Sequence, residues 1–472
     1  PVTAVQRVVD DFSRRFMSIP DPRFQEKVQD VQDLGHRIVR NLQQRDEHDG
    51  DYRGHVVAAH DIFPSELVKL YLQNVEGLAF SGGGATSHVA ILAQSLNLPV
   101  VATADPRLFS ATTGTQVVID AEDGKIVVRP GKEILDAYRS RISALGMRRL
   151  TASEEPLPDI LRTSDGAEIS LFANVNLVKD ARAAHQLNAA GVGLYRSEFP
   201  FLIRNGFPTE DEQLAVYQRV VEETAGRPVS FRTLDLGGDK LLSSQVGRED
   251  NPFLGFRGIR FLLEHRELFR EQLRAMLRAG AGIELGIQFP MIASLDEFLA
   301  ARNEVHMCID QLTREGVTHN RTPRLGVMIE LPSAIDIAPE LAEVADYLSI
   351  GTNDLIMYML AADRTNHRVG ELYRTVHPAV LRAIARLMEA VAPTGIPISV
   401  CGAAATDPAM IAFFLGVGIR SLSVDPDGLT SVAEVIQRTS VAEAREIAAR
   451  MRATADRSRL AELAEAVRSQ FH

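Results

Sequence analysis

The chain has 472 residues, 45% of them hydrophobic and 24% charged, which is enough to bury the cores of two or three domains. Its formal net charge of -11 argues against nucleic acid as a partner, so an anionic substrate would need a local group of arginines. There are two cysteines, Cys308 and Cys401, no signal peptide and no apolar run of membrane-spanning length. The sequence therefore predicts a cytoplasmic protein without disulfides and without a membrane partner.

Residues 1–46 are predicted to be helical, because apolar residues recur at the spacing of one helical face in two stretches. Pro20 and Pro22 separate the two stretches. The apolar positions are Val5, Val8, Val9, Phe12 and Phe16 in the first stretch and Val28, Val31, Leu34, Ile38 and Leu42 in the second.

Residues 47–128 predict a small α/β domain, because short β-rich runs are separated by turns and by a helix around residues 87–96. The runs are HVVAA, GLAFS, PVVATA and QVVID. Residues 129–166 follow as a linker, made of a helix and then a loop.

From residue 167 to residue 472, β-rich runs alternate with amphipathic helices, which predicts a (β/α)8 TIM barrel. The runs are ISLFANV, GVGLYRS, VSFRTLD, LGIQFPM, RLGVMIE, YLSIGT, PISVCG and SLSVD. Polar residues stand at or just after the ends of these runs, and in a barrel those ends open onto the face where active sites lie. They are Asn174, Arg196, Arg232, Glu330, Asn353 and Cys401.

The segment SGGGATSHVAILAQ, residues 81–94, combines three glycines with His88 at the start of a predicted helix. Glycines let the backbone approach a charged group closely, and the N–H groups of a helix start attract anions. This environment suits a phosphoryl group carried on the His88 ring. The structural alternative, a glycine turn that feeds a helix with His88 as a surface or capping residue, is about equally supported by the segment alone.

A second pattern is a set of arginines at strand ends. Arginine binds carboxylate and phosphate through a planar fork, so several arginines at one barrel mouth favour a small polyanion as ligand. They are Arg196 in GVGLYRSEF, Arg232 in FRTLDLGGDK and Arg364 in LAADRTN, with Lys240 close behind. Arg257 and Arg260 in NPFLGFRGIR are either ligands or partners of nearby acids.

Acidic residues follow two adjacent strands, with Glu330 in GVMIELPSA and Asn353 and Asp354 in IGTNDL. A few oxygen ligands beside a phosphate site are what Mg2+ prefers, which favours a metal at Glu330 and Asp354 over simple helix caps.

Cys401 in ISVCGAAATDP stands just past a strand, where its thiol can act as a proton donor. A lone cysteine is more often only buried, so this role depends on the rest of the site.

Together these segments resemble the phosphoenolpyruvate (PEP)-utilising enzymes, and in particular enzyme I of the bacterial phosphotransferase system, from about residue 15 to about residue 430. The motifs occur in the family's order: GGGATSHVAI, GVGLYRSEF, RTLDLGGDK, NPFLGFRGIR, FPMI, GVMIE, SIGTNDL, DRTN, HPAV and CG..A.DP. The resemblance implies a swivelling phosphohistidine domain with remnant N-terminal helices, followed by the PEP-binding TIM barrel. The sequence of the motif SGGGATSHVAI is closer to that of the nitrogen-related paralogue than to that of the sugar enzyme.

The resemblance also implies a role for each matching residue. His88 matches the phosphorylated histidine and Cys401 the proton donor. Substrate-binding positions match Arg196, Arg232, Asn353, Asp354 and Arg364, and the Mg2+ ligands match Glu330 and Asp354. The implied reaction is transfer of the phosphoryl group of PEP to His88, release of pyruvate, and transfer to a small HPr/NPr-like phosphocarrier protein, carried out by a homodimer.

Three features depart from the family pattern. Residues 1–46 are shorter than the usual helical carrier-docking region, which predicts that part of the N-terminal region is lacking. Ala403 stands where the family has an acidic residue after Cys-Gly, and Gln94 where it commonly has arginine. These departures leave open a weakly active or non-catalytic PEP-binding regulator. A fragment of a PEP synthase or pyruvate phosphate dikinase is the remaining alternative, although residues 1–50 supply no nucleotide-binding domain.

Overall fold

The computed structural model describes two compact units of the chain, the first built mainly from residues 1–143 and the second from residues 144–201, 207–237 and 251–472. The described residues are 2–17, 52–60, 62, 66–67, 70–71, 73, 75–80, 93, 98–103, 105, 108, 111–121, 124–139, 156–202, 207–236, 251–363 and 369–471.

The first unit begins with helix α1 (Val2–Met17), which confirms the first predicted helical stretch; the second stretch lies outside the described residues. A parallel sheet follows in the order β1 (Val56–Ala59), β2 (Gly77–Phe80) and β3 (Val100–Ala102). The antiparallel pair β4 (Val117–Asp120) and β5 (Lys125–Val128) completes the described strands of this unit.

All four predicted β-rich runs of the small domain are confirmed as β1 to β4. Strand β5 was not among the predicted runs, although three of its four residues are β-branched and apolar; all four are at least partly exposed. Strand β2 is fully buried, and its Gly77 is needed there, because a Cβ would lie 3.0 Å from the Ile119 side chain of β4.

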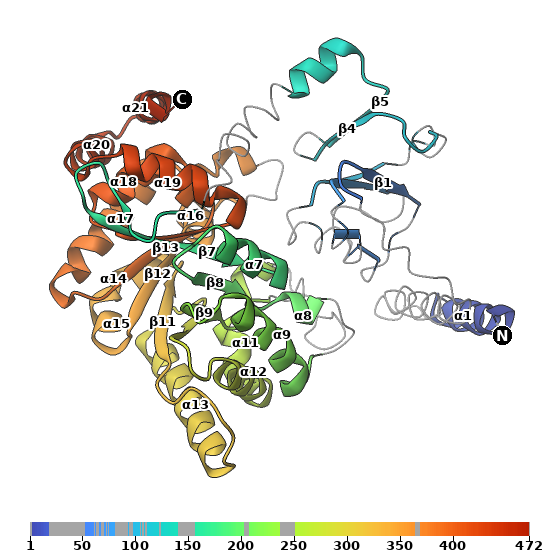
Figure 1. The fold of residues 1–472 in the computed structure, drawn as a ribbon, viewed down its shortest axis with the longest axis horizontal. Coiled ribbons are helices and arrows are strands. Elements are labelled where there is room, and N and C mark those ends of the chain that lie inside the picture. Colours follow the sequence, from blue (N-terminus) through green and yellow to red (C-terminus); the bar gives the residue numbers. More distant parts are fainter. Residues whose placement is uncertain are drawn as a thin grey trace. The chain divides into compact units, whose positions relative to one another are not determined.

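The second unit is a closed barrel of parallel strands in which β14 pairs with β7 to complete the ring (Figure 1). Every predicted strand run from ISLFANV to SLSVD is confirmed. The strands are β7 (Glu168–Val175), β8 (Val192–Arg196), β9 (Val229–Arg232), β10 (Leu285–Phe289), β11 (Arg324–Ile329), β12 (Tyr347–Gly351), β13 (Ile398–Cys401) and β14 (Ser421–Val424). A short strand β6 (Leu161–Arg162), within the predicted linker, adds antiparallel to β7.

Helices surround the barrel and cover the outer faces of its strands (Figure 1). They are α7 (Val178–Gln186), α8 (Phe199–Leu202), α9 (Glu210–Glu223), α11 (Ile259–Glu264), α12 (Arg266–Ala279), α13 (Leu295–Arg314), α14 (Pro332–Asp336), α15 (Ala338–Val344), α16 (Thr352–Leu360), α17 (Pro378–Val391), α18 (Pro408–Gly416), α19 (Leu429–Arg438), α20 (Val441–Ala453) and α21 (Arg457–Arg468). Short 3-10 turns include η1 (Pro252–Leu254), η2 (Gly370–Leu372), η3 (Ala392–Thr394), η4 (Ala403–Thr406), η5 (Pro426–Gly428) and η6 (Ser469–Phe471).

The layer between strands and helices is aromatic near β8 and β9. Tyr195 and Phe231 point outward from these strands and pack against Tyr217 of α9, with ring centroids 5.1 to 5.7 Å apart. All three rings are fully buried, so they fix the outer face of the two strands. The next residue of β8 and of β9, Arg196 and Arg232, consequently points to the opposite, inner face.

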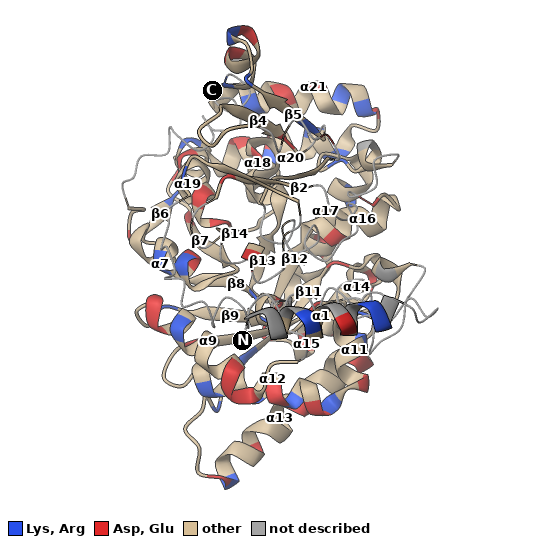
Figure 2. Ribbon diagram, turned by 90° about the vertical axis from the view of Figure 1, so that its right-hand side faces the viewer, with Lys and Arg blue, Asp and Glu red and all other residues tan. Residues whose placement is uncertain are grey.

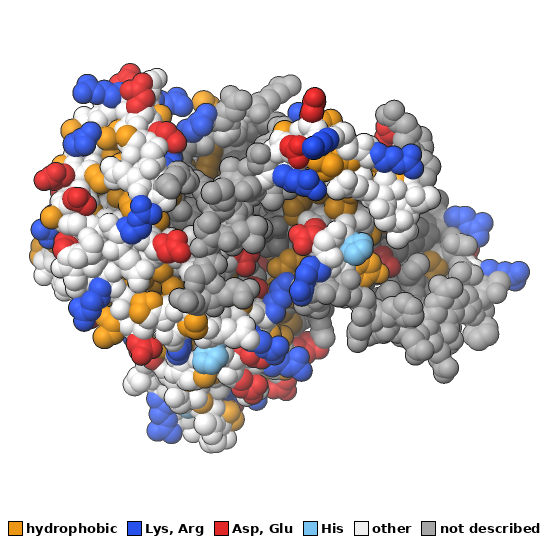
Figure 3. Space-filling view, turned by 45° about the horizontal axis from the view of Figure 1, so that its top comes forward, with side chains coloured by type: hydrophobic (Ala, Val, Ile, Leu, Met, Phe, Trp, Pro, Cys, Tyr) orange, Lys and Arg blue, Asp and Glu red, His pale blue; other side chains and the backbone are white. Residues whose placement is uncertain are grey.

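The outer surface of the helices carries mixed charges, as Figure 2 shows for α12 and α13. Arg274 and Arg278 of α12 both pair with Glu210 of α9, and Arg274 also reaches Glu315 after α13. Lys and Arg side chains are intermixed with Asp and Glu side chains over the described part of the face in Figure 3. No helix in the described part of the chain is long and apolar enough to span a membrane.

Candidate active site at the carboxyl end of the barrel

The predicted site residues that the structure describes all lie at the carboxyl end of the barrel. Strands β8, β9 and β13 end at their own site residues, Glu330 follows β11, and α16 begins directly after β12. The residues are Arg196, Arg232, Glu330, Asn353, Asp354 and Cys401. His88, Arg364 and Lys240 lie outside the described residues, so their places stay predictions.

Arg232 is held by two acids. Its Nη2 lies 2.6 Å from Glu198 Oε1 and its Nη1 lies 3.2 Å from Asp235 Oδ2, while the backbone N–H of Asp235 donates to the same Glu198 oxygen. Burial lowers the pKa of Arg232, but the charges of Glu198 and Asp235 raise it above its usual range. The guanidinium is therefore a permanent, pre-oriented cation.

Arg257 belongs to the same network, because Asp235 accepts from both its Nε and its Nη2, at 3.1 and 2.8 Å. Its Nη2 is also 3.4 Å from Asp354 Oδ2, and its Nη1 donates to the Tyr358 hydroxyl at 3.2 Å. Arg257 thus pairs with acids and at the same time lies within the site. Arg260 instead donates to backbone carbonyls of the preceding loop.

Glu330 is 1% exposed and accepts a hydrogen bond from the backbone N–H of Met291 at 2.7 Å. Burial, together with the charges of Asp354 and Asp235, raises its pKa well above the usual range. A Cβ at Gly351 would lie 3.0 Å from Glu330 Oε2, so a side chain at this position would crowd the carboxyl group. The carboxyl group therefore lies in a site that favours either a proton or a cation.

The charges of this cluster do not balance. Glu198, Asp235, Glu330 and Asp354 carry four carboxylates, which face the guanidiniums of Arg232 and Arg257. When all four carboxylates are ionised, they exceed the two guanidiniums by two negative charges, and a small divalent cation would offset this excess and hold Glu330 in its charged form. Among the described residues, no group of three or more His, Cys, Asp and Glu side chains could hold a metal, so water and substrate would complete the ligand set of such an ion.

Asn353 is held by the segment that follows Cys401. The backbone N–H of Ala403 donates to Asn353 Oδ1 at 3.0 Å, whereas the side chain of Ala403 is exposed. Gly402 makes this approach possible: its φ is 96°, and a Cβ there would lie 2.4 Å from Thr352 Oγ1. The Cys-Gly pair of the motif therefore fixes the position of Asn353.

Cys401 is 3% exposed and lies on the inner face of β13, against Leu194 and Met328. Its Sγ is 3.7 Å from Ser349 Oγ and 3.6 Å from the carbonyl oxygen of Ile350. Burial raises the pKa of the thiol above its usual value. The sulfur therefore keeps its proton at neutral pH, which is the form that a proton donor needs.

Arg196 lies at the rim and is less buried, with 25% of its side chain exposed. Its Nη1 donates to Asn176 Oδ1 at 3.0 Å and lies 3.6 Å from Asp425 Oδ1. Asn174, the polar residue at the end of β7, accepts a hydrogen bond from Ser423 at 2.8 Å and serves the packing of the barrel.

Two acids of the site were not predicted. Glu198 and Asp235 stand inside the motifs GVGLYRSEF and RTLDLGGDK, two residues after Arg196 and three residues after Arg232. The signal available in the sequence is an acid just beyond an arginine at a strand end. Only the fold shows that Glu198 and Asp235 meet at one guanidinium.

Comparisons with known proteins agree with this architecture. Residues 153–441 match the family model described as PEP-utilising enzyme, PEP-binding domain, and residues 51–124 match the PEP-utilising enzyme, mobile domain. A phosphoenolpyruvate-protein phosphotransferase of Geobacillus stearothermophilus is 39% identical over 393 residues, which cover 83% of this chain and 68% of that protein.

Two further relatives cover almost the whole chain. The phosphoenolpyruvate-protein phosphotransferase of Priestia megaterium is 34% identical over 99% of this chain and 82% of its own length. A multiphosphoryl transfer protein of Rhodobacter capsulatus is 38% identical over 95% of this chain, which spans 54% of that protein.

The barrel with its charged carboxyl end defines the class as the PEP-utilising enzymes, to which the chain belongs. Within that class, it belongs to the family of phosphoenolpyruvate-protein phosphotransferases, the enzyme I family of the phosphotransferase system.

Proposed function

We propose that this chain transfers the phosphoryl group of PEP to His88, releases pyruvate, and passes the phosphoryl group to a histidine of a small HPr/NPr-like phosphocarrier protein. The observation that carries the proposal is the meeting of a buried guanidinium, a carboxylate pair and a protonated thiol at one end of the barrel. The guanidinium suits a phosphate ester, the carboxylate pair suits a divalent cation, and the thiol suits a carbon that must be protonated.

PEP would be held by its anionic groups at Arg196, Arg232 and Arg364, with Asn353 as a further polar contact. Arg232 supports this role because Glu198 and Asp235 fix its orientation before a ligand arrives. A pre-oriented cation lowers the barrier to phosphoryl transfer, since charge that spreads over the transferring group meets a fixed countercharge.

The residues present fit Mg2+, with Glu330 and Asp354 as its protein ligands. When bound, the ion would neutralise negative charge on the phosphoryl group. The excess negative charge of the cluster supports this site, because a divalent cation would offset it.

Two groups of the chain would exchange atoms with the substrate. A neutral ring nitrogen of His88 forms a bond to phosphorus while the bond from phosphorus to the enolate oxygen breaks. The Cys401 thiol then gives its proton to the methylene carbon of enolpyruvate, and pyruvate leaves. The high pKa of the buried thiol supports a donor that remains protonated at neutral pH. Because His88 lies in the small domain, that domain would have to swing between barrel and carrier.

Finer points are proposed from family resemblance. They are membership of the nitrogen-related branch, a homodimer and a cytoplasmic location.

The test is intact-mass spectrometry after the protein is mixed with PEP and Mg2+, with His88→Ala as control. We expect an acid-labile gain of one phosphoryl group, absent from the control, with an equal amount of pyruvate released. PEP binding without any mass gain would contradict the proposal and would favour a non-catalytic PEP-binding regulator.

A further inference from the structure

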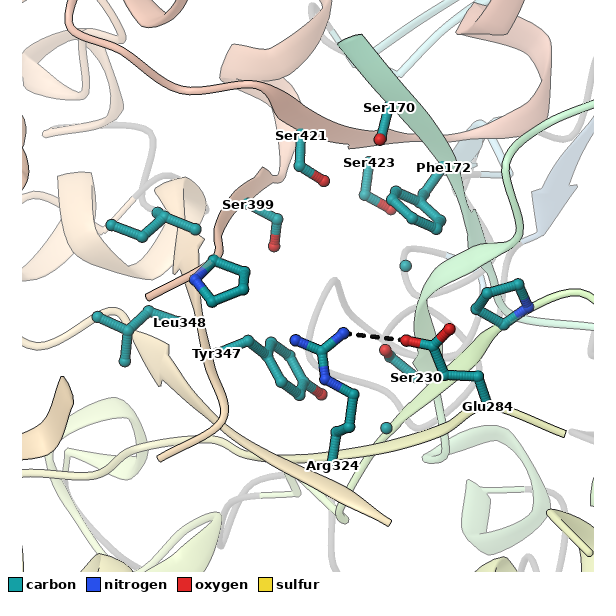
Figure 4. A pocket seen from close by; sticks show the side chains of 15 residues that line it. Ser170, Phe172, Ser230, Glu284, Arg324, Tyr347, Leu348, Ser399, Ser421 and Ser423 are labelled. Carbon is teal, nitrogen blue, oxygen red and sulfur yellow. Dashed lines mark hydrogen bonds and ion pairs between the residues drawn. The ribbon is translucent and has the colours of Figure 1, made fainter. Parts of the chain in front are cut away.

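A cavity lies inside the same barrel, at the amino ends of its strands. It has a volume of about 290 Å3 and is lined by the first residues of several strands. Arg324 begins β11, Tyr347 begins β12 and Ser421 begins β14, while Glu284 directly precedes β10 (Figure 4). Glu330 follows the end of β11, six residues from Arg324, or about 20 Å along the strand. The cavity is therefore separate from the candidate active site.

The cavity exists because the inner face of the barrel is under-filled at this level. Barrel interiors are usually packed with bulky branched side chains. Here seven of the fifteen lining residues are small, namely Ser170, Gly193, Ser230, Gly286, Ser399, Ser421 and Ser423. The serine hydroxyls drawn in Figure 4 lie around the cavity, so its wall offers many donors and acceptors.

The apolar part of the wall comes from two aromatic rings together with Pro228, Leu348, Pro397 and Ile398. Tyr347 lies across the strand beside it, since a Cβ at Gly326 would be 2.3 Å from the Tyr347 ring. Its buried hydroxyl has no hydrogen-bond partner of ordinary geometry among the described residues, although Ser230 lies nearby and burial raises the phenol pKa. Phe172 of β7 lines another part of the cavity. A buried hydroxyl without a partner costs free energy that a ligand can recover.

The charged groups of the cavity pair with each other. Arg324 Nη1 lies 3.0 Å from Glu284 Oε1, and both side chains are about half exposed at the opening (Figure 4). The guanidinium also lies over the Tyr347 ring, with its central carbon 5.6 Å from the ring centroid. The lining thus carries no net charge, and an ionic ligand would enter without a countercharge.

We propose that this cavity binds a small neutral polyhydroxylated compound of about monosaccharide size. Its volume is at the lower limit of ligand pockets, which are typically about 300–1,000 Å3. The serine and tyrosine hydroxyls match the hydroxyls of such a ligand, and the aromatic rings match its C–H faces. The paired Arg324 and Glu284 offer further donors and acceptors at the opening.

The test is saturation-transfer NMR and calorimetry on the full chain without PEP or Mg2+, so that a failure here is independent of the proposed phosphotransfer. The probes are glucose and myo-inositol, with gluconate as the anionic and glucosamine as the cationic analogue. We expect at least one neutral probe to bind saturably, about tenfold or more tighter than both charged analogues. No neutral binding up to about 20 mM, or equal binding of the charged analogues, overturns the proposal.

Ser399→Leu fills the cavity, and Ser164→Leu, at an exposed serine of the β6–β7 turn, is the matched control. The first should weaken neutral-probe binding about tenfold or more, and the control should leave it unchanged. If Ser399→Leu does not fold, Tyr347→Phe is used, which keeps the ring and removes the unpartnered hydroxyl. Unchanged binding in the folded variant would place the ligand elsewhere and overturn the proposal.

Discussion

The two ends of the barrel use the same strands in opposite ways. At the carboxyl end, buried guanidiniums and carboxylates form one connected network with an excess of negative charge. At the amino end, serine hydroxyls surround a cavity whose charged residues pair with each other. Strand β11 contributes to both, with Glu330 after its last residue and Arg324 as its first.

This difference shows how little the fold itself dictates function. Eight strands close the ring at both ends with the same backbone bonding, and side chains alone make one end reactive. Substitutions at the carboxyl end should therefore change chemistry, and matched substitutions elsewhere should not.

The largest effect is expected for Cys401→Ala compared with Cys308→Ala. Both cysteines are buried, but only Cys401 lies at the carboxyl end. Loss of a positioned proton donor typically costs about 10²–10⁴-fold in rate. Pyruvate release, followed by a coupled dehydrogenase assay, should slow by that factor in Cys401→Ala while PEP binding remains. Full turnover in this variant would exclude the sulfur as donor.

A second comparison is between the phosphorylation rates of Arg232→Met and Arg162→Met. Arg232 pairs with Glu198 in a buried network, whereas the Arg162–Glu168 pair lies exposed at the amino end of β7. We expect phosphorylation of Arg232→Met to slow about 10²–10³-fold, since a fixed countercharge is lost. An exposed pair contributes about 0–1 kcal/mol, so Arg162→Met should keep its rate. Equal rates in the two variants, measured by quenched-flow mass spectrometry, would contradict the proposed role of Arg232.

Glycines provide a comparison based on backbone strain. Gly402 and Gly395 both have positive φ, at the two ends of β13, but only Gly402 would place a Cβ against Thr352. Gly395→Ala should cost about 1–2 kcal/mol from φ alone. Gly402→Ala should cost more in urea unfolding and should also slow phosphorylation, because Asn353 would shift. A smaller loss in Gly402→Ala than in Gly395→Ala would contradict the packing described for Cys401-Gly402.

The smallest effect concerns Asp165, in the turn between β6 and β7. Its carboxylate accepts hydrogen bonds from Thr163 and Ser440, and the Thr163 bond contributes most to lowering its pKa from 3.8 to about 2. A lowered pKa in the folded state stabilises the protein above pH about 4, and this stabilisation is lost as the pH falls toward 2. In Asp165→Asn, the acid-induced loss of stability in this window should be smaller. An unchanged profile in pH-dependent urea unfolding would show that these bonds are absent in solution.

Much of this structure was predictable from sequence, because strands buried on both faces leave continuous apolar runs such as LGVMI in β11. The clustering of Arg232, Glu330 and Cys401 followed from one rule, that all strands of the barrel end on the same face. The rule does not tell which acids pair with which arginine. The sequence therefore did not decide whether Arg257 is a ligand-binding residue or a structural partner of nearby acids, and it assigned no role to Glu198 and Asp235.

The cavity at the amino end was not predicted for a related reason. Glycines and serines near strand starts, such as Gly286 and Ser399, are compatible with a well-packed barrel if neighbouring side chains fill the space. Whether they do depends on the directions of Phe172 and Tyr347, which only the fold fixes.

The most direct measurement of the central claim is exchange of isotope-labelled pyruvate into PEP, which requires reversible phosphorylation of His88 at this barrel. We expect exchange in the unmodified chain with Mg2+, none in folded His88→Ala, and exchange slowed about 10²–10³-fold in folded Arg232→Met. Exchange that persists in His88→Ala would contradict the account, as would its absence from an unmodified chain that binds PEP.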